Sequence, residues 1–188
     1  MRHNFKKLQV MSKKNDFILK VLNVVSWIVF IGLCIEAGAL LFNFILTLFN
    51  PIAANNIYKG LNLSALYEVN FARYIGVMSF VVVLSLMKAY LFYLVVKIFM
   101  KLNLVKPFNI EIAKLIEKIS FEAFAIAIVI VIAHQYTKRL IQSGYELGGV
   151  GQYWDDTAAF LMMAAIIFVI SQIFKKGIEL QNENDLTV

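Results

Sequence analysis

The amino-acid sequence predicts an all-α integral membrane protein with four transmembrane helices, arranged as two hairpins with both termini in the cytoplasm. The first observation behind this prediction is composition. Of the 188 residues, 61% are hydrophobic and 16% are charged, against about 45–50% and about 25% in typical soluble chains. The second is the grouping of apolar residues into four runs near the length of about 20 residues that crosses a bilayer as a helix. A soluble domain of this size cannot bury helices that are apolar on every face.

The third observation is the distribution of basic residues, which predicts the orientation. Residues 1–20 carry six Lys or Arg residues against one acid, Asp16. They are similar to the start of a signal peptide, but the apolar run after them is too long and lacks a cleavage site, so we expect an uncleaved first span. Cytoplasmic loops carry an excess of Lys and Arg, and residues 97–118 carry five such residues. The predicted outer loops carry only Lys59, Lys138 and Arg139, with Arg73 at a span edge.

The four spans are predicted over residues 21–48, 71–96, 119–136 and 154–174, with residues 1–20 and 175–188 as cytoplasmic tails. Pro51 limits the first span, because proline lacks an N–H and clashes with the preceding turn. Polar loops follow at residues 50–70 and 137–153. Tyr136, Tyr153 and Trp154 are expected at the outer membrane interface, where aromatic rings prefer to lie.

The cytoplasmic connector, residues 97–118, contains a predicted helix start. Pro107 disfavours helical geometry at the residue before it, Asn109 is a good N-cap type, and Glu111 falls in the first turn, where a carboxylate offsets the helix dipole. Apolar residues then recur at helical spacing among Lys and Glu. We therefore expect an amphipathic helix from about Ile110 that lies on the membrane surface and leads into the third span. It is either a connector whose lysines reach the headgroups or a docking surface for a cytoplasmic protein.

Two short runs carry a resemblance to a known family. They are Lys106-Pro107-Phe108-Asn109-Ile110-Glu111, followed by a helix rich in Ile, Leu and Lys, and the terminal run Glu183-Asn184-Asp185-Leu186-Thr187-Val188. Together they resemble the bacterial four-span membrane family catalogued as domain of unknown function 2975, over most of the chain from the first span to Val188. The long, lysine-rich N-terminal tail departs from many relatives. The resemblance implies no activity, but it implies a link to small helix-turn-helix regulators, beside which members are often encoded.

Ionisable residues inside the predicted spans are the second set of candidates, because such a group costs several kcal/mol at bilayer depth and usually faces a partner or water. At a rise of about 1.5 Å per residue, Lys88 and Glu122 fall at similar depth, which permits an ion pair. Glu36 is nearer the level of His134, with Arg73 within reach. The face of Glu36 also carries small and polar residues and is expected to point into the bundle; these are Gly32, Ala39, Asn43 and Thr47. The five ionisable groups are either structural pairs or the lining of a polar pocket or ion path.

Two classes of function fit these features. The first is a non-enzymatic sensor or regulator in the bacterial inner membrane that holds a cytoplasmic protein through residues 106–111 and 183–188. The second is a small transporter or channel component that works as a homo-oligomer through Glu36, Lys88 and His134. A membrane enzyme is a distant third, because no catalytic motif, cofactor site or metal-ligand spacing is recognisable, and no direct nucleic-acid partner is expected. The carboxylates Asp155 and Asp156 are expected to serve the start of the fourth span or to balance Lys138 and Arg139.

Overall fold

The computed structural model describes residues 2–102 and 109–186, and these form helices without a strand. The elements are α1 (Arg2–Phe49), the 3-10 turns η1 (Pro51–Asn55) and η2 (Tyr58–Gly60), α2 (Ser64–Val69), α3 (Phe71–Lys101), α4 (Ile110–Gln142), the 3-10 turn η3 (Val150–Tyr153) and α5 (Thr157–Leu186). The all-α prediction is therefore confirmed. Five residues of the predicted docking runs lie outside the described residues: Lys106, Pro107, Phe108, Thr187 and Val188.

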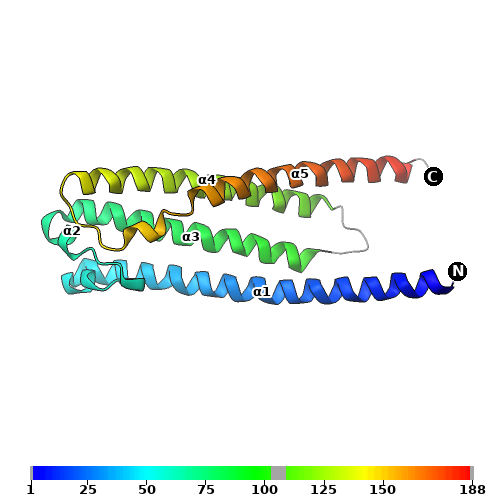
Figure 1. Ribbon diagram of the computed structural model, residues 1–188, viewed down its shortest axis with the longest axis horizontal. Helices are drawn as coiled ribbons and strands as arrows, with labels where there is room; N and C mark the ends of the chain where they lie inside the picture. Colours follow the sequence, from blue (N-terminus) through cyan, green and yellow to red (C-terminus); the bar gives the residue numbers. More distant parts are fainter. Residues whose placement is uncertain (1, 103–108, 187–188) are drawn as a thin grey trace.

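The long helices form a row rather than a closed bundle. Among the described elements, α1 packs along α3, α3 along α4 and α4 along α5, so α1 and α5 stand at the two ends of the row (Figure 1). The beginning of α1, the end of α5 and the ends of α3 and α4 that flank the connector lie at one end, which we call the terminal end. The short elements η1, η2 and α2 lie at the opposite end, which we call the loop end.

Asparagine caps fix where the helices begin. Asn50 accepts a hydrogen bond from the backbone N–H of Ile52 in a turn that starts with Pro51, which confirms that the first long helix stops before this proline. The side chain of Asn70 caps α3 by accepting from the N–H of Arg73. Asn109 caps α4 by accepting from the N–H of Glu111 at 2.7 Å. The predicted helix start at Ile110 is therefore confirmed, since each cap satisfies an N–H that the first turn leaves unpaired.

Three helical segments of the described chain are long and apolar enough to cross a membrane: Phe17–Phe49, Phe71–Lys101 and Val150–Glu183. They contain the predicted first, second and fourth spans. The segment of α4 is not among them, and its first turns carry Glu111, Lys114, Glu117, Lys118 and Glu122. Many of the largest apolar side chains face outward, such as Ile28, Met162 and Ile173, each more than 60% exposed. A surface of this kind is stable in hydrocarbon, as expected of a membrane protein.

The loop end holds a dense apolar core that the sequence did not predict. Residues 50–70 were expected to be a polar loop, but Ile57, Leu61, Leu63 and Leu66 are fully buried there. They pack with α1 and α3 in one cluster that includes Tyr74. Other apolar side chains of the segment, Ile52 and Val69, are exposed at 75% and 70%, so composition alone does not show which of its residues are buried.

The face of α1 that is turned inward includes most of the predicted one. Thr47 is fully buried, and Glu36, Ala39 and Asn43 are partly buried. Ala37 and Leu40 beside them are also buried. The prediction fails at Gly32, which is exposed and has no neighbour within 4 Å of a Cβ built on it.

The last long helix starts later than the predicted span because the preceding loop folds back along the bundle. The chain leaves α4 at the loop end and runs back towards the middle before α5 begins at Thr157 (Figure 1). Tyr153 and Trp154 become buried on the way, at 7% and 3% exposure. The folded loop turns these rings against the protein, and their predicted depth at the membrane interface stays a prediction. Tyr136 is half-buried beside Phe80.

Candidate functional site

A pocket of about 300 Å³ lies between the two end helices of the row. Charged side chains and apolar side chains both line it, so we call it the polar pocket. Its lining comes from five separate parts of the chain: Leu33 and Glu36 of α1, Lys59 of η2, Lys88, Leu91 and Phe92 of α3, Gln152 and Tyr153 of η3 with Asp156 after it, and Phe160 of α5.

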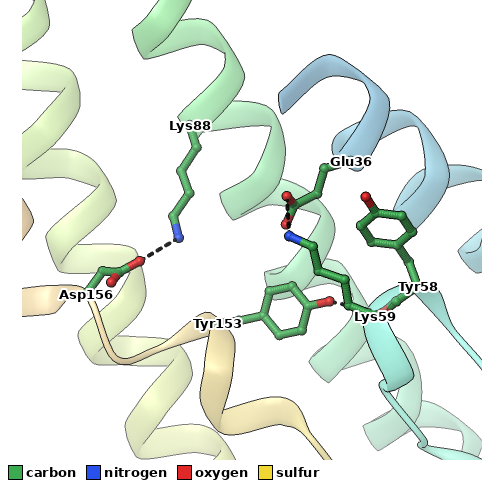
Figure 2. Close-up of polar contacts among 6 residues, drawn as sticks. All are labelled: Glu36, Tyr58, Lys59, Lys88, Tyr153 and Asp156. Carbon is green, nitrogen blue, oxygen red and sulfur yellow. Dashed lines mark hydrogen bonds and ion pairs between the residues drawn. The ribbon is translucent and has the colours of Figure 1, made fainter. Parts of the chain in front are cut away.

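Two ion pairs line the polar pocket (Figure 2). The ammonium of Lys59 donates to Glu36 Oε2 at 2.7 Å, and the ammonium of Lys88 donates to Asp156 Oδ2 at 3.2 Å. Each pair joins a residue of a long helix to a residue of a loop-end segment. The two pairs carry equal numbers of positive and negative charges, so the lining has no net charge.

Aromatic side chains hold these segments in place. Tyr153 donates its hydroxyl to the carbonyl of Tyr58 at 3.3 Å, which ties η3 to η2 (Figure 2). The ammonium of Lys88 also lies 5.5 Å from the ring centroid of Phe160. A cation over an aromatic face is attracted by the ring quadrupole. The pocket wall is therefore built by contacts between elements far apart in the sequence.

The helix members of each pair are more buried than the loop members. The side chains of Glu36 and Lys88 are 22% and 21% exposed, against 50% for Lys59 and 55% for Asp156. The hydrogen bond to the Glu36 carboxylate raises the pKa of Lys59 above its ordinary value, so its ammonium stays charged at neutral pH. The loop member of each pair is therefore the one more accessible to water.

The structure brings together two of the five predicted intramembrane residues, Glu36 and Lys88. The suggested pair of Lys88 with Glu122 is wrong, because Lys88 bonds to Asp156, and Glu122 lies half-buried elsewhere on α4. Of the two roles expected for Asp156, it stands at the start of α5, where its carbonyl accepts from the N–H of Phe160 at 3.0 Å, while its carboxylate pairs with Lys88 and not with Lys138 or Arg139. Counting helix rise cannot show that the loop folds back and carries Asp156 to the level of Lys88.

The remaining two predicted residues lie away from the polar pocket. The guanidinium of Arg73 packs over the ring of Tyr145, with its carbon 4.6 Å from the centroid, and does not reach Glu36. His134 is exposed on α4. Prediction from the sequence also missed Lys59, Asp156 and Gln152 as pocket residues. The available signal was charge, since few charged residues occur in the two outer loops.

At the terminal end, the described parts of the predicted docking runs serve structural contacts. Glu111 forms an ion pair with Lys101, which joins the end of α3 to the start of α4. Lys175 bonds to Glu117 at 2.6 Å and joins α5 to α4. Glu183 is exposed, and Asn184, Asp185 and Leu186 continue α5. The start of α4 and the end of α5, which carry the described residues of the two predicted docking runs, lie towards the same end of the row (Figure 1).

Comparison with known proteins gives one match. A family model described as Protein of unknown function (DUF2975) matches residues 19–188. No curated protein and no solved structure matches this chain.

Proposed function

This chain belongs to that family of proteins of unknown function, and on this premise we propose that it is a non-enzymatic membrane sensor or regulator. In this proposal α1, α3, α4 and α5 cross the bacterial inner membrane, and both termini lie in the cytoplasm. The polar pocket faces the outer side, and the terminal end holds a cytoplasmic protein.

The packing of α4 supports four crossings rather than three. This helix is 33 residues long and lies between α3 and α5, both of which contain spans of sufficient length and hydropathy. A helix that packs along two spanning neighbours lies in the bilayer with them. The charged residues of its first turns then lie at the cytoplasmic surface, where lysine side chains reach the headgroups.

The observation that carries the proposal is the continuity of the helices that line the polar pocket. Glu36 lies on α1 and Phe160 on α5, and both helices run unbroken from the pocket to the terminal end (Figure 1). A change in the pocket that moves either helix is therefore felt at the other side of the membrane. Rigid helices that have two arrangements are the usual carriers of such coupling.

The partner in this proposal is a cytoplasmic protein, of the helix-turn-helix type that the family resemblance implies. The test is affinity purification in mild detergent of the full chain and of a chain that lacks residues 183–188. We expect the truncated chain to lose a partner that the full chain retains. The control is Lys138→Gln, which changes an exposed lysine near the end of α4 at the loop end and leaves residues 183–188 intact. A truncated chain that retains every partner refutes the proposal.

The topology has a separate test by cysteine labelling. Cys34 is the only cysteine and is exposed on α1, so Cys34→Ser gives a cysteine-free chain. Ser143 at the loop end and Asn182 at the terminal end are exposed. With a membrane-impermeant maleimide, S143C is expected to react in intact cells and N182C only after lysis. Labelling of both from outside, or the reverse pattern, contradicts the proposed topology.

A second candidate function, a transporter or channel component, is favoured by the presence of Glu36 and Lys88 in one pocket. Four spans are few for a path within one copy, so this function requires a homo-oligomer. Ion or solute flux in proteoliposomes that is unchanged by Glu36→Gln counts against it.

A further inference from the structure

The position of the polar pocket along the helices corresponds to one surface of the bilayer. Glu36 follows Lys20 by 16 residues, or about 24 Å of helix, and Lys175 follows Thr157 by 18 residues, or about 27 Å. The hydrocarbon core is about 30 Å thick. If Lys20 and Lys175 lie at the cytoplasmic surface, the pocket lies at the depth of the opposite headgroups. This placement rests on the topology of the proposed function.

The polar pocket adjoins the helix surfaces that face lipid in the proposed topology. It lies between α1 and α5, the two helices at the ends of an open row. Part of its lining is apolar, from Leu33, Leu91 and Phe92. Towards the terminal end, the exposed side chains of α1 and α5 are largely apolar, such as Ile28 and Ile166. A ligand with a charged head and hydrocarbon tails matches both the charged lining of the pocket and the apolar surfaces of α1 and α5. A soluble ligand contacts only the first.

The charges of the polar pocket define the head. Two ammonium groups, from Lys59 and Lys88, lie in the same lining as two carboxylates, from Glu36 and Asp156. A phosphate accepts hydrogen bonds from lysine ammonium groups, and a primary ammonium donates to carboxylates. A ligand that carries both groups satisfies both kinds of side chain and keeps the net charge of the pocket at zero. A ligand with only one of them matches only one kind of side chain in the lining.

The size of the pocket excludes a whole lipid but admits a headgroup. Its volume of about 300 Å³ equals that of roughly ten water molecules. We propose that the polar pocket binds the headgroup of a phospholipid that carries a phosphate and a primary ammonium, as in phosphatidylethanolamine. Lys59 and Lys88 hold the phosphate, Glu36 and Asp156 hold the ammonium, and the acyl chains lie along α1 and α5. The soluble compound phosphoethanolamine has the same head chemistry without the tails.

The test is a binding titration of the full chain, released from detergent and followed by native mass spectrometry. The ligands are dioctanoyl phosphatidylethanolamine, dioctanoyl phosphatidylglycerol and phosphoethanolamine. We expect the first to bind at least about tenfold more tightly than the second, which lacks the ammonium, because each lost charge-assisted hydrogen bond weakens binding by about that factor. Lys88→Gln and Asp156→Asn are each expected to weaken phosphatidylethanolamine binding about tenfold. The matched control, Lys176→Gln, changes an exposed ion pair outside the pocket and leaves binding unchanged.

Several results overturn the proposal. They are the absence of phosphatidylethanolamine binding, equal binding of the two lipids, and equal binding by the wild type and both pocket variants. Phosphoethanolamine that binds as tightly as the lipid assigns the pocket to a soluble ligand of the same chemistry and overturns the lipid assignment. The comparison of lipids uses only the wild-type chain, so it decides even if a pocket variant fails to fold. A wrong topology is detected separately by the cysteine labelling, since binding in detergent does not depend on orientation.

Discussion

The hydrogen bond between Tyr74 and Thr47 allows a quantitative test of how α1 is held against α3. The Tyr74 hydroxyl donates to Thr47 Oγ1 at 2.6 Å, and both residues are 0% exposed. Thr47 Oγ1 in turn donates to the carbonyl of Phe44 at 2.7 Å. Tyr74→Phe removes one hydrogen bond but leaves the threonine hydroxyl bonded. The expected loss in the free energy of unfolding is about 1 kcal/mol.

Removal of the acceptor is expected to cost more than removal of the donor. Thr47→Val leaves the Tyr74 hydroxyl buried without its acceptor, and an unpaired buried polar group costs about 1–3 kcal/mol. The double variant has neither hydroxyl, so we expect it to be more stable than Thr47→Val alone. This order depends on burial, because in water the tyrosine hydroxyl would find another partner.

The assay is thermal unfolding in mild detergent, followed by the fluorescence of the buried Trp154. A loss of about 1 kcal/mol corresponds to roughly 2–4 °C for a chain of this size. Ser143→Ala is the control, because its hydroxyl bonds to the Arg139 carbonyl on an exposed surface and its removal should change stability by less than about 0.5 kcal/mol. If Thr47→Val is no less stable than Tyr74→Phe, or if the losses simply add in the double variant, the two hydroxyls do not form a buried bond.

Two further predictions concern pairs of matched positions. A Cβ at Gly76 would lie 2.8 Å from Tyr136 Oη, whereas one at Gly32 meets nothing within 4 Å. Gly76→Ala is therefore expected to lower stability by about 1 kcal/mol or more, and Gly32→Ala to raise it by up to about 1 kcal/mol through helix propensity; thermal unfolding that gives equal shifts would show that the tyrosine moves aside freely. Glu36→Leu is expected to lower the free energy of unfolding by about 1 kcal/mol more than Glu122→Leu does, because Glu36 is paired with the lysine of η2. Wild-type stability in detergent for both variants would contradict a structural role for that pair.

The features that the sequence predicted correctly are local. The helix start at Ile110 follows from Asn109 and the proline before it, and the end of α1 follows from Pro51. Each depends on the backbone chemistry of a few adjacent residues, which a sequence displays directly. The apolar runs of the predicted first, second and fourth spans are of the same kind, since a run of about 20 apolar residues is long enough to cross a bilayer as a helix.

The features that the sequence did not predict depend on where a loop goes. Lys88 and Asp156 are 68 residues apart, and Glu36 and Lys59 are 23 apart. The rise per residue gives depths only for positions on the predicted helices, so the sequence predicted Glu122 as the partner of Lys88. Trp154 was placed at the interface by the general preference of its side chain, but the folded loop buries it. The sequence therefore singled out Glu36 and Lys88, whereas their partners Lys59 and Asp156 require the tertiary structure.

The packing of α1 is uneven, with its buried positions concentrated near the loop end. Between residues 17 and 35 only Ser26 is buried, whereas Ala37, Leu40 and Thr47 are held firmly against α3. The segment from Phe17 to Glu36 covers 19 residue steps of the helix, or about 28 Å. A small rotation about the buried positions, near the polar pocket, therefore produces its largest displacement at the opposite end of this segment. In such a rotation, the largest displacement falls on the part of α1 that has the fewest buried residues.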